Sequence, residues 1–154
     1  MSEWKSLLDE AVRRGDVSSE AGANIDLYLQ GANSPVGAAA IIELLEAGEW
    51  QEIDDRFFKT MAFGTGGLRG RTIGKIVTRA ERGVGGPLDR PQHPCVGTAS
   101  MNFFNLKRAM IGLVTYVKKT FSGEGRPSLV IGHDTRHFSR DFAETCAEVA
   151  INLG

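Results

Sequence analysis

The sequence predicts an α/β fold, namely a three-layer α/β/α domain with a truncated, mixed sheet, preceded by an all-helical amino-terminal segment. Residues 1–60 show the apolar spacing of helices. Residues 129–131 form a short, wholly apolar run ending at Gly132, which is typical of a strand covered on both faces. Helical patterns lie on both sides of that run, an order typical of α/β proteins. With 154 residues, of which 42% are hydrophobic, the chain can build one compact core.

The amino-terminal segment, residues 1–60, is predicted to be helical and to carry no chemistry. In its first run, apolar residues recur three and four positions apart. They are Trp4, Leu7, Leu8, Ala11 and Val12, and Gly15 ends the run. A second run begins at Pro35 and ends at Gly48, and a third spans residues 50–61. We interpret this acidic segment as a packing extension of the domain that follows.

Residues 61–154 are predicted to form the first part of the α/β domain. Residues 72–78 can form a strand, whereas residues 79–94 are rich in glycine and proline and are predicted to be a long loop, either a mobile lid or an insertion. Helices are expected from Phe103 and from Ser139 onwards. The chain stops where the last helix should lead to a further parallel strand, so we expect it to be the first part of a longer protein.

Charge and composition disfavour several classes of protein. Residues 1–60 hold 5 basic against 12 acidic side chains, whereas residues 61–110 hold 8 against 2, which suggests an anionic partner for the basic middle. Aromatic side chains are too sparse there for base stacking, so we expect small phosphorylated ligands and no nucleic acid. No apolar run approaches the roughly 20 residues of a membrane span. Cys95 and Cys146 fit neither a disulfide framework nor a zinc site, so a reduced, cytoplasmic protein without membrane or metal ligands is expected.

The first candidate site is the glycine-rich run FGTGGLRG at residues 63–70. Arg69 stands where the third glycine of a dinucleotide-binding fingerprint should be, and Ile76 follows Lys75 where a Walker A loop needs Ser or Thr. What remains is a run of backbone N–H groups that a ligand can approach closely, beside a guanidinium that can grip phosphate. Two interpretations stay open: a tight turn with a solvated arginine, or a phosphate-facing loop.

The second candidate is the run GHDTR at residues 132–136, at the carboxyl end of the predicted strand, where open α/β sheets bind ligands. Asp134 and Arg136 could point the same way, or Asp134 could turn the loop with Arg136 as its ion-pair partner. Ser100 is a weak candidate nucleophile, because no general base lies near it in the sequence and it stands just before a predicted helix, where serine often serves as a cap.

Together, FGTGGLRG at residues 63–70 and IGHDTRHFS at residues 131–139 resemble the α-D-phosphohexomutase superfamily, which includes phosphoglucomutases and phosphomannomutases. The family pattern is similar to FGT-[SAG]-GLRG, then a helix, then a strand ending G-x-D-[ST]-R-x-x-S. The stretch around residues 55–58 is similar to the branch of larger phosphoglucomutases and phosphopentomutases. The resemblance covers about residues 36–154 and implies the amino-terminal portion of domain I.

The resemblance implies an isomerase of carbohydrate metabolism that acts as an intramolecular phosphotransferase. Such an enzyme moves phosphate between C1 and C6 of a hexose, or C1 and C5 of a pentose, through a phosphoserine and a bisphosphorylated sugar, with Mg²⁺ balancing the charge. Arg69 would face the phosphoserine as a supporting catalytic residue, and Asp134 and Arg136 would brace the edge of the domain. The substrate-binding residues implied by the resemblance are Thr65, Gly66, Gly67, Arg69 and Arg136.

The sequence also departs from the family. The phosphoserine loop, similar to TASHNP, is not reached, and Thr98 to Ser100 only imitate its first letters, so we interpret Ser100 as a decoy. The loops that hold the metal, choose the sugar and bind the distal phosphate are absent. We therefore expect an inactive fragment whose partners are a phosphosugar, the missing carboxyl-terminal domains and a second copy of itself. The alternative is a non-catalytic module that binds phosphate esters or another partner through residues 64–69.

Overall fold

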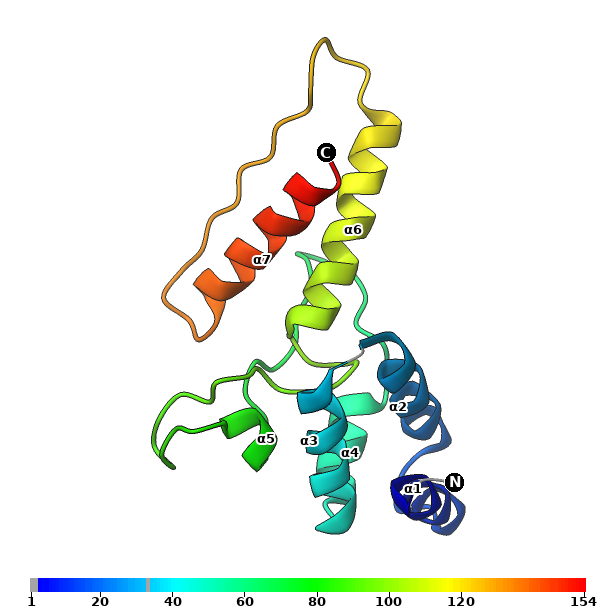
Figure 1. Cartoon of the computed structure of the whole chain (residues 1–154). Helices are drawn as coiled ribbons and strands as arrows, with labels where there is room; N and C mark the ends of the chain where they lie inside the picture. Colours follow the sequence, from blue (N-terminus) through cyan, green and yellow to red (C-terminus); the bar gives the residue numbers. More distant parts are fainter. Residues whose placement is uncertain (1–2, 33) are drawn as a thin grey trace. The chain divides into compact units, whose positions relative to one another are not determined.

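The computed structural model describes residues 3–32 and 34–154, and the chain divides into two compact units, Met1–Asn102 and Phe103–Gly154 (Figure 1). Residues 1, 2 and 33 of the predicted helical extension lie outside the described residues. In the described part of the chain, no helix combines the length and the apolar character that crossing a membrane requires. The predicted domain boundary after residue 60 stays a prediction.

The helices follow the chain in order. Those of the first unit are α1 (Glu3–Arg14), α2 (Ser19–Ala32), α3 (Pro35–Glu46), α4 (Trp50–Phe57) and α5 (Arg79–Arg82), and those of the second are α6 (Phe103–Thr120) and α7 (Ser139–Asn152). The predicted starts at Pro35, Phe103 and Ser139 are confirmed. The α3 start is fixed locally, because the Ser34 side chain accepts a hydrogen bond from the Gly37 N–H at 3.2 Å. The sequence patterns miss α2, whose apolar face is diluted by alanine and glycine.

The helices of the first unit enclose an apolar core. Tyr28 of α2 meets Phe57 of α4 edge to face, with ring centroids 5.8 Å apart. The other buried apolar side chains of these helices include Leu8, Ala11, Ala21, Ile25, Ala40, Ile41, Leu44, Leu45 and Ile53. Each large one contributes about 1.5–3 kcal/mol by leaving water, so this core fixes α4 against its neighbours.

A buried cluster of charges lies at the carboxyl-terminal end of α4. Arg56 is wholly buried, and its guanidinium donates to the Glu52 carboxylate at 2.8 Å and to the Glu81 carboxylate at 2.6 Å. It also donates to the main-chain carbonyls of Ile76 and Val96. An isolated buried charge is very costly, so the two carboxylates and these carbonyls are what make a buried arginine tolerable here.

The predicted loop at residues 79–94 is wrong for its first four residues, which form α5. Thr78 and Glu81 make a reciprocal capping box, and Gly83 ends the helix with φ of 67°. The rest of the segment is tied back to α5. The Gln92 N–H donates to the Arg82 carbonyl at 3.2 Å, and the His93 N–H donates to the Glu81 carbonyl at 2.9 Å.

The expected three-layer α/β/α domain with a mixed sheet is wrong, because the described residues contain no sheet and their β-pairing is limited to one bridge between Gly64 and Gly67. At residues 72–78 the main chain forms hydrogen bonds with groups that do not belong to a neighbouring strand. The Thr72 carbonyl accepts from the Cys95 N–H at 2.9 Å, and the Ile76 carbonyl accepts from Arg56. These isolated contacts hold the segment irregular, since a strand needs a continuous ladder.

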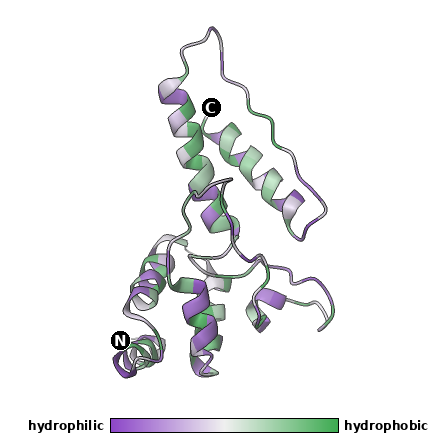
Figure 2. Cartoon of the chain, turned by 180° about the vertical axis from the view of Figure 1, so that it is seen from behind, coloured by the Kyte–Doolittle hydropathy of each residue, from purple (hydrophilic) through white to green (hydrophobic). Residues whose placement is uncertain are grey.

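In the second unit, α6 and α7 lie side by side (Figure 1), and Figure 2 shows apolar residues along both helices. Phe142 of α7 packs against Phe103, with ring centroids 5.2 Å apart. The predicted buried strand at residues 129–131 is also wrong. Val130 is 95% exposed, and no main-chain hydrogen bond among the described residues joins this run to another segment. An apolar composition shows that a run could be buried as a strand, but a run becomes a strand only when it pairs with another strand.

Replacing Arg56 tests how far the first unit depends on its buried charges. Arg56→Met should lower the free energy of unfolding by about 3–5 kcal/mol, because Glu52 and Glu81 would stay buried without their cation. The midpoint of urea unfolding, followed by tryptophan fluorescence, measures this. Both tryptophans of the chain, Trp4 and Trp50, lie in the first unit.

The matched control is Arg79→Met, which removes an exposed arginine paired with Glu43 at 3.4 Å. Its loss should stay within about 0.5 kcal/mol, because exposed ion pairs contribute little. Equal urea midpoints for the Arg56 and Arg79 variants would contradict the importance given to the buried cluster.

Candidate functional site

The glycine-rich run at residues 63–70 forms a tight exposed turn in the first unit. Gly64 and Gly67 exchange main-chain hydrogen bonds of 3.1 and 3.3 Å. Between them the chain adopts a left-handed conformation, with φ of 86° at Gly66 and 106° at Gly67, which only glycine adopts without strain. Thr65 lies exposed at the tip. The turn therefore presents bare main chain to solvent.

Arg69 lies over this turn. One terminal nitrogen of its guanidinium, Nη2, is 3.0 Å from the position that a Cβ on Gly66 would occupy. The side chain is exposed and forms no ion pair within the described residues. A guanidinium beside exposed main chain is an arrangement suited to an anion such as phosphate.

Both ends of the turn are held by the segment at residues 95–101. On one side, the Met61 N–H donates to the Thr98 carbonyl at 2.8 Å. On the other, the Met101 N–H donates to the Arg71 carbonyl at 2.9 Å. Between these bonds Gly70 lies so close to the segment that a Cβ would be 2.8 Å from the Ala99 carbonyl oxygen. Both ends of the exposed turn are thus anchored to residues 95–101.

Ser100 belongs to the segment at residues 95–101 that anchors the turn. Its side chain is buried, and its hydroxyl lies 3.3 Å from the Cys95 sulfur. Burial also raises the pKa of the Cys95 thiol, so that the thiol stays protonated at neutral pH. A hydroxyl buried against a neutral thiol is positioned for packing rather than for attack on a phosphate ester.

The second candidate, Asp134 with Arg136, lies in the second unit. The Asp134 carboxylate accepts the Arg136 N–H at 3.1 Å and the Arg136 Nε–H at 2.7 Å, and the Asp134 N–H donates to the Ser139 hydroxyl at 3.1 Å. The Arg136 N–H, followed by Ser139 and the Arg136 guanidinium, lowers the pKa of Asp134 below 3.8. Asp134 therefore turns the loop and pairs with Arg136, while the Arg136 side chain stays exposed.

The loop reaches α7 through a strained residue. Phe138 precedes the helix with φ of 64°, a left-handed conformation that costs a non-glycine residue about 1–2 kcal/mol. Its ring packs against Phe142 with centroids 5.8 Å apart, and this packing offsets the strain. Arg69 and Arg136 belong to different units, so each is placed only within its own unit.

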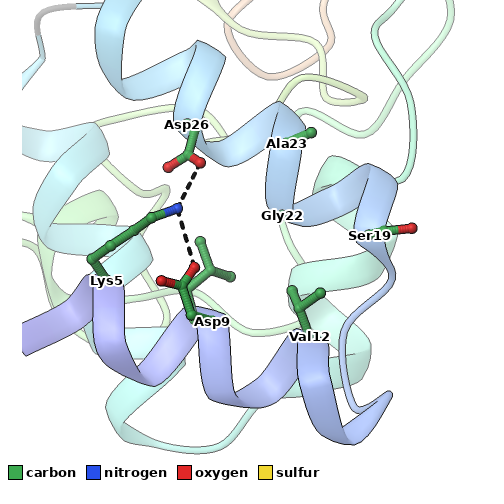
Figure 3. A pocket seen from close by; sticks show the side chains of 8 residues that line it. Lys5, Asp9, Val12, Ser19, Gly22, Ala23 and Asp26 are labelled. Atoms are coloured by element: carbon green, nitrogen blue, oxygen red, sulfur yellow. Dashed lines mark hydrogen bonds and ion pairs between the residues drawn. The ribbon is translucent and has the colours of Figure 1, made fainter.

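A pocket of about 300 Å³ lies between α1 and α2 (Figure 3). The Lys5 ammonium crosses it and donates to Asp26 at 2.6 Å while lying 3.2 Å from Asp9. The hydrogen bond that the Lys5 ammonium donates to Asp26 is the main cause that raises the pKa of Lys5. Because both acids already bind this cation, the charges lining the pocket are satisfied by one another.

The family resemblance implies Mg²⁺, and the fit of the chain to a metal can be judged from its acidic and histidine side chains. Among residues 3–32 and 34–154, no group of three or more His, Cys, Asp or Glu side chains is arranged to hold a metal ion. The described residues thus do not supply a magnesium site by themselves, and no chemical step of this chain is assigned to a metal.

The known proteins that resemble this chain include one family model and two fungal relatives. Residues 94–154 match the family model of phosphoglucomutase/phosphomannomutase alpha/beta/alpha domain I. A phosphoribomutase of Saccharomyces cerevisiae is 27% identical over 138 residues, and a probable phosphoribomutase of Schizosaccharomyces pombe is 28% identical over 114 residues. These matches cover 90% and 74% of this chain. No solved structure matches it significantly.

The chain spans only 18% and 16% of the lengths of these two relatives. A match over 90% of the chain includes the glycine turn at residues 63–70, and the family model includes the Asp134 loop, so both candidate sites lie in the matched regions. Taken together, the domain match and the two relatives show that this chain is similar to the phosphohexomutase superfamily, in its amino-terminal domain I portion.

Proposed function

We propose that the chain is the amino-terminal portion of a cytoplasmic phosphosugar mutase, in which its glycine turn helps to bind a phosphate group. The observation that carries this proposal is the Arg69 guanidinium, which lies over the bare main chain of Gly66 with no acidic partner among the described residues. Thr65, Gly66 and Gly67 offer main-chain and hydroxyl groups beside it. A phosphate held there would be gripped by charge and hydrogen bonds together.

The proposed reaction transfers phosphate between C1 and the terminal hydroxyl-bearing carbon of a sugar phosphate. A phosphoserine outside this chain would donate its phosphoryl group and regain one from a bisphosphorylated intermediate. This chain contributes positioning and charge, which dominate phosphoryl transfer. The names of the two fungal relatives favour a pentose, and hence C1–C5 transfer, over a hexose. Mg²⁺ would balance the phosphate charge from ligands that the described residues do not supply.

Arg136 has a different part in the proposal. Its Nε–H is committed to Asp134, so only the outer nitrogens of the guanidinium are available to a substrate. Asp134 keeps the arginine in one orientation, and a charged group that is oriented before binding loses less entropy when it binds. Arg136 is therefore proposed as a secondary phosphate ligand that the Asp134 turn positions.

The isolated chain should show no mutase turnover, because the proposed nucleophile lies outside it and Ser100 is buried against Cys95. A coupled assay with ribose 1-phosphate and with glucose 1-phosphate measures this. Turnover by the wild-type chain that disappears in Ser100→Ala would show that Ser100 acts as a nucleophile and would overturn the assignment.

In the full-length mutase that the proposal requires, Arg69→Ala should lower kcat/KM by about 100-fold, since a charge-stabilising donor of this kind contributes about 3 kcal/mol. Folding should change little, because the side chain is exposed. Arg69→Lys should recover only part of the loss, because lysine lacks the planar fork of donors. Melting temperatures measured beside the kinetics separate binding from folding.

The control for this experiment is Arg13→Ala, which removes an exposed arginine near the end of α1. Its kcat/KM should equal that of the wild type. If the Arg69 variant kept full activity, or lost activity only in proportion to its unfolding, the phosphate-binding role would be wrong. Phosphate binding by an isolated chain that lacks any downstream mutase sequence would instead favour a non-catalytic phosphate-ester module.

The Asp134 loop should have a pH dependence of definite sign. Because the folded pKa of Asp134 lies below 3.8, its contribution is present above the unfolded pKa and is lost as the pH falls through the folded value. The NMR titration of its carboxyl carbon should therefore have a midpoint below 3.8. Arg136→Ala should raise that midpoint only in part, since the main-chain N–H at position 136 remains. A wild-type midpoint at or above 3.8 would contradict the turn described here.

A further inference from the structure

A row of alternating charges, here called the charge row, runs from the buried cluster of the first unit to its surface. Its members, in order from the interior outwards, are Glu81, Arg56, Glu52, Arg71, Asp55 and Lys75. The exposed fraction of the side chain rises from 0% at Arg56 through 32% at Arg71 to 68% at Lys75. The charge row thus links α4 to the residues that follow the glycine turn.

Arg71 is the member of the charge row that lies nearest to the glycine turn along the chain. It stands two positions after Arg69, and two residues span at most about 7 Å. Its carbonyl accepts the Met101 N–H at 2.9 Å, whereas its side chain attaches to α4. Gly70, between the two arginines, is closely packed, because a Cβ there would be 2.5 Å from the Met61 Cε. A shift of Arg71 is therefore passed on to Arg69 rather than absorbed at Gly70.

The Arg71 guanidinium bridges two carboxylates of α4. Its Nη1 lies 3.3 Å from Glu52, and its Nη2 lies 3.6 Å from Asp55. These acids are three positions apart, which places them on the same side of the helix. The Glu52 carboxylate is itself fixed, since it is buried and its other oxygen accepts the Nε–H of Arg56 at 2.8 Å. Because each outer nitrogen of Arg71 faces a different carboxylate, the guanidinium cannot turn without losing one of them.

Folding stability gives only a small reason for these ion pairs. Arg71 is partly exposed, and ion pairs of exposed side chains contribute little to stability. Without Arg71, the buried Glu52 would still be paired with Arg56. Direct binding of an anion by Arg71 is also disfavoured, because both of its outer nitrogens already lie near carboxylates. What the two pairs fix is the direction in which the chain leaves the glycine turn.

We propose that Arg71 is a positioning residue, whose pairs with Glu52 and Asp55 hold the glycine turn so that the Arg69 guanidinium faces a phosphate group. This inference rests on the proposed function, because it concerns the phosphate that Arg69 is proposed to bind. A group that is oriented before binding loses less entropy when it binds, and a misplacement of about 1 Å can cost much of its effect. Arg71 thus acts on the ligand only through Arg69.

The test is a double-mutant cycle in the full-length mutase, with ribose 1-phosphate as the substrate. Arg71→Met should lower kcat/KM by about ten-fold when Arg69 is present. In the Arg69→Ala background the same change should have almost no effect, because the residue through which Arg71 acts is already absent. The melting temperature of Arg71→Met should fall by only a few degrees, since the buried charges keep their partners.

Two milder variants separate the ion pairs from the rest of the side chain. Arg71→Lys should recover part of the lost kcat/KM, because an ammonium can pair with one carboxylate but lacks the fork that bridges two. Asp55→Asn removes the outer carboxylate and leaves the buried pair of Glu52 and Arg56 intact. It should lower kcat/KM several-fold, and again only while Arg69 is present.

The matched control is Arg79→Met, which removes an arginine–glutamate pair of similar length, 3.4 Å, from the same unit and should leave kcat/KM unchanged. Full activity of Arg71→Met, beside a loss in Arg69→Ala, would overturn the positioning role. A loss in Arg71→Met that persists in the Arg69→Ala background would also overturn it, because Arg71 would then act independently of Arg69. Full activity of Arg69→Ala is a separate outcome, which would refute the proposed phosphate site itself.

Discussion

The first unit depends on the burial of one guanidinium. Arg56 extends from α4 and holds two carboxylates that are far from each other in the sequence, Glu52 one turn earlier and Glu81 in α5. Glu81 in turn accepts the main-chain N–H groups of Thr78 and Val96 at 3.0 and 2.7 Å. Each charge in this interior is tolerable only because the others are present, so the segments that supply them are placed together or not at all.

The residues that anchor the glycine turn are connected to this buried cluster. The Arg56 carbonyl accepts from the Ala99 N–H at 2.9 Å, and Arg71, just beyond the turn, lies 3.3 Å from Glu52. Since residues on both sides of the turn are anchored in this way, the tip at Thr65 to Gly67 can be fully exposed without losing its shape. The arrangement is that of many binding loops, in which an exposed tip is positioned by a rigid scaffold.

Most of the long helices could be predicted from the sequence, although α2 and α5 were missed, and the lack of a sheet among the described residues could not be predicted. Helix signals are local, as in the Ser34–Pro35 start of α3, whereas a strand exists only with a partner that local patterns do not identify. The run at residues 129–131 has the composition of a buried strand, yet Val130 is exposed. The Arg56 cluster was detectable only in pieces, as the four-residue spacing from Glu52 and as the Thr78–Glu81 capping box.

The ion pairs in the structure change the interpretation of the charge pattern along the sequence. The basic middle of the chain suggested an anionic partner, but much of its charge is neutralised by the acidic helices before it. Lys75 pairs with Asp55 at 2.7 Å and Arg79 with Glu43, while Arg71 lies near both Glu52 and Asp55. Arg69 has no such partner among the described residues. A polyanion needs a row of free cations, whereas the exposed Arg69 guanidinium over the glycine turn is suited to one phosphate group.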